Sequence, residues 1–151
     1  MNKFARWAFV FLLVFSSTLH AFDVTVTGSF KILDVTRVGG KVILPLERNQ
    51  YANIRLLRSQ TYCALSACAE PCVLAGDPLT PSVDTVRPAR TREGMWIAEV
   101  DFLPSWRMTF LVFKKGGKLD VKFPAHVVFI NPALEKRTRE LILQSITQEL
   151  L

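Results

Sequence analysis

The chain has 151 residues, of which 19 are lysine or arginine and 13 are aspartate or glutamate, for a formal net charge of +6. A chain of this length is typical of one domain with its own core. The basic residues are spread along the chain rather than massed, so a dedicated nucleic-acid site is not expected. The P-loop, nucleophile-elbow, zinc-protease and dinucleotide-binding motifs of common enzyme classes are absent from the sequence.

The first residues have the layout of a secretory signal peptide. Met1–Arg6 carries two bases and no acid, Trp7–Phe15 is an unbroken apolar run, and polar residues then lead to a small residue, Ala21. A membrane-spanning helix needs about 20 apolar residues, and this run is much shorter. We therefore expect residues 1–21 to be cleaved and residues 22–151 to form a single β-rich domain, located in the periplasm or secreted. No later stretch approaches the length of a membrane span.

The first part of the expected domain shows strand patterns separated by turn signals. Phe22–Thr27 alternates apolar and polar residues, as a half-buried strand does. Gly39-Gly40 lies between two apolar runs and predicts a tight hairpin turn, because both turn positions need a positive φ. Pro45 lacks an amide hydrogen, so its strand lies at a sheet edge or ends there. The strands expected here are 22–27, 29–36, 41–47 and 51–58.

The middle of the chain is less regular. Residues 61–75 hold all three cysteines, and their secondary structure is ambiguous, because their alanines permit a helical turn that Pro71 limits. Residues 76–94 contain three prolines among small polar residues. We expect this segment to be a long loop, a feature that is often functional or mobile.

Clearer strand patterns follow. In 96–102 the even-numbered residues are all apolar and alternate with Ile97, Glu99 and Asp101, which predicts a strand. A corner follows at 103–106. Residues 108–113 are largely apolar on both faces, which predicts a central strand. Glu99 and Asp101 fall on the presumed outer face of the first of these strands, where carboxylates are typical of a solvated surface. Gly116-Gly117 predicts a second hairpin turn. The last expected strands are 119–123 and 127–130.

The C-terminal residues 132–151 change to a helical period. Asn131 is a favoured N-cap, and Pro132 fits the first helical position. The apolar row of this helix consists of Leu134, Ile142, Ile146 and Leu150, with Thr138 as its polar member. This stripe is expected to pack on the sheet or on a partner. Short strands and one terminal helix together predict a mainly β fold, an antiparallel β-sandwich or small open barrel of Ig-like size.

Cys63, Cys68 and Cys72 are the only cysteines, and they fall within ten residues. In an exported protein the usual fate of such thiols is a disulfide. Three cysteines allow one bridge and leave one thiol over, and sequence distance alone permits any of the three pairings. The closed loop is short, so we expect the bridge to stabilise the fold by about 2 kcal/mol.

A metal site is the alternative use of these residues, because thiolates bind Cu(I) and zinc. Cys68 and Cys72 are separated by three residues, and His126, the only histidine of the expected mature chain, could add a nitrogen ligand. This spacing with a distant histidine resembles the copper site of the Sco-type assembly proteins. The resemblance covers those three residues alone. The thioredoxin-like βαβ pattern of that family is absent, and its function is not carried over.

Two further groups are candidate binding residues. Trp96 and Trp106 would form a recognition patch if they were exposed together, since aromatic side chains anchor interfaces; the alternative is packing in the core. Arg87, Arg90 and Arg92 cluster near the end of the expected loop. They could clamp a carboxylate or phosphate, or serve only to keep the loop soluble.

The sequence therefore favours an exported, non-enzymatic protein that acts as an accessory or assembly subunit by binding another envelope or secreted protein, without a cofactor. An edge strand could accept a partner strand, or the terminal helix could dock by its stripe. One alternative is a periplasmic copper-binding or thiol-redox protein that uses Cys63, Cys68, Cys72 and His126. The other is a small-ligand carrier with a cavity between its sheets, gated by the loop at 76–94.

Overall fold

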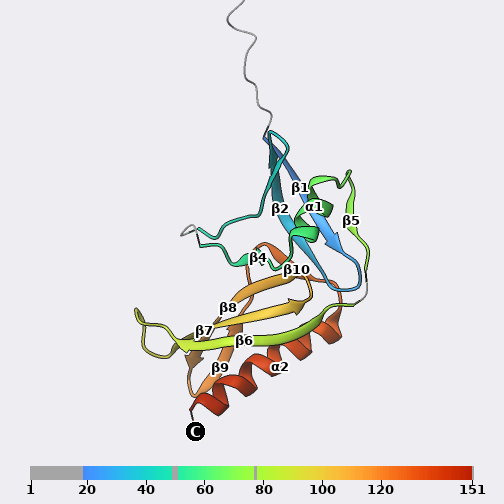
Figure 1. Ribbon diagram of the computed structural model, residues 1–151. Coiled ribbons are helices and arrows are strands. Elements are labelled where there is room, and N and C mark those ends of the chain that lie inside the picture. The colour runs from blue at the N-terminus through green and yellow to red at the C-terminus, as the bar shows by residue number, and fades with distance from the viewer. Residues whose placement is uncertain (1–18, 49–50, 77, 151) are drawn as a thin grey trace, which may run out of the picture.

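The computed structural model describes residues 19–48, 51–76 and 78–150. In this part of the chain there are two five-stranded sheets, here named sheet A and sheet B, and two helices. Figure 1 shows sheet A in the upper half of the view and sheet B in the lower half, with the C-terminal helix lying along sheet B. The predicted fold class, mainly β with a C-terminal helix, is confirmed.

Sheet A contains β1 (His20–Val26), β2 (Phe30–Val38), β3 (Lys41–Ile43), β5 (Cys72–Leu74) and β10 (Val127–Phe129). Its order is β10-β2-β1-β5, with β3 added to one end of β2. The pairs are antiparallel except for β5, which runs parallel to β1. Gly39 and Gly40 join β2 to β3 with φ values of +54° and +78°. Other residues rarely adopt such values, so this hairpin forms as predicted.

Sheet B contains β4 (Ile54–Leu56), β6 (Thr80–Pro88), β7 (Met95–Leu103), β8 (Trp106–Lys115) and β9 (Lys118–Lys122). Its order is β4-β8-β7-β6, and β9 pairs with the other end of β8. Because β8 has neighbours on both sides, the prediction of a central strand at 108–113 is confirmed. The Gly116-Gly117 turn connects β8 to β9, also as predicted.

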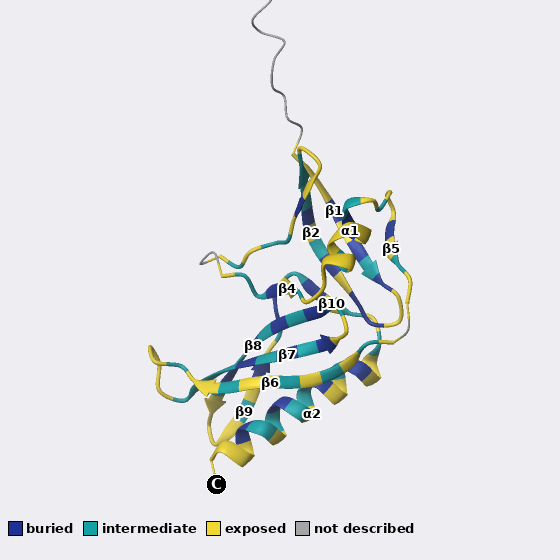
Figure 2. Ribbon diagram, in the orientation of Figure 1, coloured by how far each residue is buried: buried dark blue, intermediate teal, exposed yellow. Residues whose placement is uncertain are grey.

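An aromatic cluster joins the two sheets. The ring of Phe30 in β2 lies 5.5 Å from that of Phe102 and 6.1 Å from that of Trp106, both edge-to-face. Phe129 adds a contact to Phe30 at 5.7 Å. Figure 2 shows the buried residues gathered along the inner sides of the strands and of the C-terminal helix. These aromatic side chains form the contact between the two sheets.

The C-terminal helix α2 (Pro132–Glu149) covers one face of sheet B. Asn131 caps its first turn, since the Oδ1 atom accepts hydrogen bonds from the backbone N–H groups of Ala133 and Leu134. The predicted apolar row is buried from Leu134 to Ile146, and the buried Thr138 hydroxyl donates to a backbone carbonyl one turn earlier. The row packs within the molecule, so the stripe is not available to a partner. The helix ends two residues earlier than predicted.

Three segments differ from the sequence expectation. The prediction of a long loop at 76–94 is wrong, because Thr80–Pro88 forms β6 and pairs with β7 along its whole length. That segment therefore cannot act as the gate of a ligand cavity. The strand expected at 51–58 is only Ile54–Leu56. The ambiguous segment 61–75 contributes to a short helix, α1 (Ser59–Ser66), and to β5.

The predicted signal peptide lies mostly outside the described residues, which begin at Leu19. Its last two residues, His20 and Ala21, belong to β1 and pair with β2. The imidazole of His20 also contacts the carboxylate of Glu70. Cleavage after Ala21 would remove this end of β1, and the position of the cut remains a prediction. Neither helix in the described part of the chain is long and apolar enough to cross a membrane.

Candidate functional site

Sheet B has one face under α2 and one face without a covering layer. Ala98, Val100 and Phe102 of β7 point into the core and are fully buried. Because successive side chains of a strand alternate, the odd-numbered residues of β7 and β8 point the other way. No helix or strand among the described residues packs on them. We call this surface the open face; on β7 and β8 it consists of Met95, Ile97, Glu99, Asp101, Arg107, Thr109, Leu111 and Phe113.

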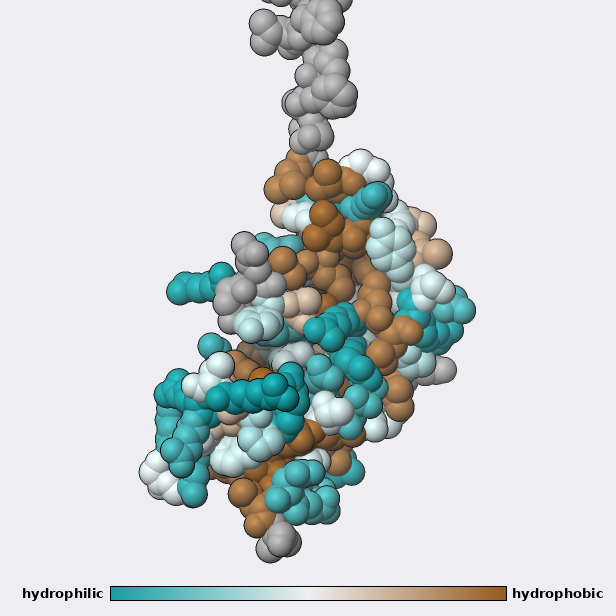
Figure 3. Space-filling view, turned by 60° about the vertical axis from the view of Figure 1, so that its left-hand side comes forward, coloured by the Kyte–Doolittle hydropathy of each residue, from teal (hydrophilic) through white to brown (hydrophobic). Residues whose placement is uncertain are grey.

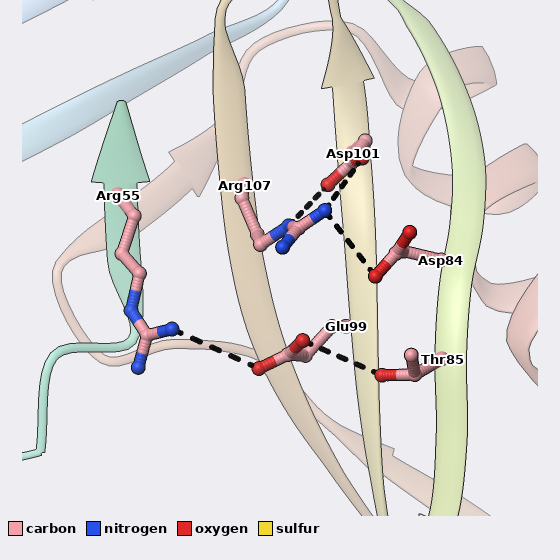
Figure 4. Close-up of polar contacts among 6 residues, drawn as sticks. All are labelled: Arg55, Asp84, Thr85, Glu99, Asp101 and Arg107. Carbon is pink, nitrogen blue, oxygen red and sulfur yellow. Dashed lines mark hydrogen bonds and ion pairs between the residues drawn. The ribbon is translucent and has the colours of Figure 1, made fainter. Parts of the chain in front are cut away.

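One half of the open face carries a ladder of ion pairs (Figure 4). Arg107 of β8 lies directly opposite Asp101 of β7. Its guanidinium donates to both carboxylate oxygens, from Nε at 2.6 Å and from Nη2 at 3.0 Å. The same Nη2 lies 3.2 Å from Oδ2 of Asp84 on β6. One arginine therefore links three adjacent strands.

A β-bulge in β6 places two further polar groups on the same side. The register of β6 against β7 shifts between Val83 and Thr85. An extra residue of this kind turns sequence neighbours to one face, so Asp84 and Thr85 both face the ladder, as Figure 4 shows. The Thr85 hydroxyl donates to Glu99 Oε2 at 3.4 Å, and Glu99 Oε1 lies 3.9 Å from Nη1 of Arg55 on β4. The ladder thus crosses β4, β8, β7 and β6.

The ladder is a fixed pattern of charges. Hydrogen bonding to Asp101 raises the pKa of Arg107 above its ordinary value, and the charges of Asp101, Asp84 and Glu99 raise it further against the opposing effect of burial. An arginine is already protonated throughout the usual pH range, so the guanidinium here exchanges no proton. Oppositely charged partners on adjacent strands stabilise one register. The ladder therefore stabilises one alignment of the strands.

Replacing Arg107 with alanine is expected to lower the free energy of unfolding by about 1–2 kcal/mol, because Asp101 loses two charge-assisted hydrogen bonds on a partly exposed surface. Urea unfolding measures this change. Arg55→Ala is the matched control: its ion pair is longer and its side chain is 55% exposed, so we expect a change below about 0.5 kcal/mol. Equal effects of the two substitutions would contradict a special role for Arg107.

The other half of the open face is apolar. Met95 lies directly opposite Phe113, and Ile97 lies directly opposite Leu111. Directly opposed side chains of an antiparallel pair are in contact range, so these four form one surface, which we call the apolar quartet. Each is of intermediate exposure, since its neighbours cover its flanks. Large apolar side chains on an uncovered sheet face are typical of an interaction surface.

Three cations border the apolar quartet, together with one acidic residue, Asp120 of β9, which lies directly opposite Phe113. Arg87 of β6 and Lys122 of β9 each lie directly opposite a member of it. The guanidinium of Arg92 stacks on the ring of Phe113, 5.3 Å from its centroid. None of the three has an ion-pair partner within the described ranges. In Figure 3, hydrophilic side chains gather over the lower half of the molecule, where sheet B lies, with hydrophobic side chains between them.

The predicted arginine group is therefore partly assembled. Arg87 lies in β6, while Arg90 and Arg92 lie in the turn between β6 and β7, and all three are exposed. Arg87 and Arg92 border the quartet. The sequence grouped these three arginines near the end of the expected loop 76–94. It was wrong to assign Arg87 to a loop, because this residue lies in a strand.

The two tryptophans do not form an exposed recognition patch. Trp106 is 1% exposed within the cluster between the sheets, and Trp96 is partly buried against the same core. Of the two interpretations that the sequence allowed, core packing describes both residues. The prediction of a shared binding surface is wrong because the side chains of even-numbered residues in β7 and β8 face inward.

Cys68 and Cys72 form a disulfide, with their Cα atoms 5.4 Å apart. Cys63 lies on α1 and is an exposed free thiol. One bridge with one thiol left over is the outcome that the cysteine count predicted. The pairing that the sequence left open is Cys68–Cys72.

His126 does not join these cysteines. Cys72 lies on β5 at one edge of sheet A, and His126 precedes β10 at the opposite edge. Three strand spacings separate the two edges, a distance of about 14 Å. The imidazole Nδ1 of His126 instead lies 3.2 Å from Oδ2 of Asp34. The predicted ligand set of Cys68, Cys72 and His126 is therefore not brought together, and no other group of three potential metal ligands occurs in the part of the chain with described positions.

The open face was only partly visible in the sequence. The apolar run at 108–113 was assigned correctly to a central strand, but its outward members were not singled out. The pairing of Asp101 with Arg107 was also missed, because it depends on the three residues 103–105 that connect the opposed residues Phe102 and Trp106.

The open face combines a charged half and an apolar half. Its carboxylates are held by arginines, and its apolar quartet is bordered by cations without ion-pair partners among the described residues. An apolar centre with a charged rim is the usual anatomy of a protein interface. Comparison of the chain with protein-family models, with curated proteins and with solved structures finds no match.

Proposed function

We propose that this protein is exported and acts, without catalysis, by binding another protein of the cell envelope as an accessory or assembly subunit, and that the open face of sheet B is the binding surface. The observation that carries the proposal is the apolar quartet on an uncovered face of a central strand pair. Export is supported by the basic and apolar N-terminal sequence and by the disulfide, which forms in oxidising compartments.

The composition of the open face supports this function. Methionine, aromatic residues and arginine are enriched in protein interfaces. Met95 and Phe113 supply the first two kinds, and Arg92 lies over Phe113 at the rim. Because Arg87, Arg92 and Lys122 outnumber the one acidic residue of the rim, Asp120, a mainly acidic partner surface is the complementary one.

Strand edges are poorer candidates than the open face. Pro81 and Pro88 lack amide hydrogens in the long edge strand β6, and the bulge at Asp84 interrupts it further. Such features protect an edge from pairing with another chain. The edge of β3 is covered as well, since the Val42 N–H donates to the Tyr62 hydroxyl at 3.4 Å. A side-chain surface therefore offers more binding area than these two backbone edges.

The test introduces a charge into the apolar quartet. We expect Ile97→Glu to reduce the yield of a specific crosslinked complex in native envelopes by about tenfold, because an interface core does not tolerate an unpaired charge. Ile130→Glu is the matched control: it makes the same change at a site that is 46% exposed and outside the open face. Its complex is expected at the yield of the unaltered protein.

Three results would contradict the proposal. The unaltered protein could be recovered from crosslinked envelopes only as a monomer. Ile97→Glu could retain the complex at full yield while its thermal unfolding shows an intact fold. Both variants could lose the complex equally, which would place the interface elsewhere. Mass spectrometry of the crosslinked peptides identifies which residues of this protein contact the partner. It therefore shows whether the interface includes the apolar quartet.

A further inference from the structure

A groove lies beside α1 and β5. It has a volume of about 550 Å³, within the range of sites that hold small molecules or short peptide segments. Its apolar lining includes Ala64 of α1, Leu74 of β5, Leu79, and Pro104 of the β7–β8 turn. None of these residues belongs to the open face.

One side of the groove is a free strand edge. The backbone N–H of Thr27 donates to the Leu74 carbonyl at 3.0 Å, so Leu74 points its hydrogen-bonding groups toward β1. These groups alternate in direction along a strand. The N–H and C=O of Val73 therefore point away from β1, and its side chain is 53% exposed beside the groove. β5 is the outermost strand of sheet A on this side. No partner of these two Val73 groups occurs among the described residues, so an extended peptide laid in the groove would meet this strand edge.

One arginine lines the groove. Arg58, the residue before the first turn of α1, is the one charged side chain among the described residues that line it. Arg58 is exposed and forms no ion pair within the described ranges. An acidic side chain or a terminal carboxylate is the group that complements it.

The groove wall is held in place before any ligand arrives. The Cys68–Cys72 disulfide ties the end of α1 to β5. The Arg37 guanidinium donates to the carbonyls of Leu65 and Cys68, at 3.0 and 2.9 Å, and so fastens the same segment to β2. A site that is already formed loses less conformational freedom when it binds.

We propose that this groove binds an extended peptide segment of a partner protein, which adds as a strand to the free edge of β5 and places an acidic group beside Arg58. Backbone hydrogen bonds to Val73 supply the strand addition, and the apolar walls receive alternate side chains of the peptide. The site is separate from the open face, and it stands or falls independently of the function proposed there.

The probe is a library of displayed short random peptides, selected on the full mature protein. A selected peptide is synthesised, and its dissociation constant is measured for two variants of one residue. Val73→Pro removes the outward N–H and is expected to weaken binding about tenfold, the effect of one lost backbone hydrogen bond. Val73→Thr keeps that N–H and is expected to bind like the unaltered protein. Thermal unfolding checks that both variants fold.

A second pair of variants tests the charge. Arg58→Gln is expected to weaken the same peptide about threefold, as an exposed ion pair does, whereas Arg90→Gln leaves binding unchanged. Ile97→Glu, the open-face variant, is also expected to bind the peptide normally. The proposal is overturned if selection enriches no sequence, if the selected peptides lack an acidic group, or if Val73→Pro and Arg58→Gln both bind as the unaltered protein does. Normal peptide binding without an envelope complex would reject only the function proposed for the open face.

Discussion

Replacing Trp106 with alanine is expected to lower the free energy of unfolding by about 3–5 kcal/mol, the usual cost of removing a large buried aromatic side chain. Trp106 is 1% exposed, and its ring packs edge-to-face on Phe30 of the other sheet. The substitution thus leaves a cavity where the two sheets meet. Because single domains are stable by only about 5–15 kcal/mol, a large fraction of the protein unfolds at moderate urea concentration. Urea denaturation followed by circular dichroism measures the change.

The matched control is Tyr51→Ala. This residue is also a large aromatic, but it is 66% exposed, so we expect a change within about 0.5 kcal/mol. A loss for Trp106→Ala no greater than that for Tyr51→Ala would contradict a core shared by the two sheets. A changed slope of the urea transition would indicate instead that the two sheets unfold separately.

Local signals account for the elements that the sequence predicted well. The pairs Gly39-Gly40 and Gly116-Gly117 form hairpins, since the positive φ values of those turns need glycine. Asn131 and Pro132 begin α2 because cap and first-turn preferences depend on a few adjacent residues. The alternation in 96–102 identified β7, because strand alternation reports burial directly.

β6 shows where local signals fail. Its prolines suggested a loop, but Pro81 and Pro88 lie in an edge strand, where a missing amide hydrogen does not disrupt the sheet. The strand forms because β7 supplies a partner along its whole length. Pairing with a segment that follows in the chain is a tertiary effect, and the composition of 76–94 carried no sign of it.

The two candidate sites depend on tertiary arrangement in the same way. The alternation of β7 and β8 separated two faces, but it could not tell that α2 covers only one of them. The apolar quartet was therefore not predicted. The ligand set that the copper hypothesis named is not brought together for a related reason: Cys72 and His126 belong to one sheet, yet the order of its strands places them at opposite edges. Spacing along the chain does not determine the order of strands.

Reduction of the Cys68–Cys72 disulfide is expected to lower the free energy of unfolding by about 2 kcal/mol, because a bridge that closes a short loop removes little entropy from the unfolded chain. The measurement uses Cys63→Ser, which leaves only the two bridged cysteines, so reshuffling cannot occur. Its urea midpoint is compared with and without a dithiol reductant. The control is a triple variant without cysteines, Cys63→Ser, Cys68→Ser and Cys72→Ala. Its urea midpoint is expected not to respond to the reductant.

Alkylation of the protein that retains all three cysteines separates the cysteine pairing from its alternatives. Alkylation of the unreduced protein is expected to modify one thiol, Cys63, which is exposed, while Cys72 is 1% exposed. Three modified thiols, or a mapped bridge that contains Cys63, would contradict the pairing.

The structural effect of reduction is also expected to be local: β5 pairs with β1 over only three residues, so its amides should exchange with solvent faster once the bridge is open. Faster exchange confined to β5 would mean that the disulfide holds the wall of the groove, whereas uniform acceleration would mean that it acts on global stability alone.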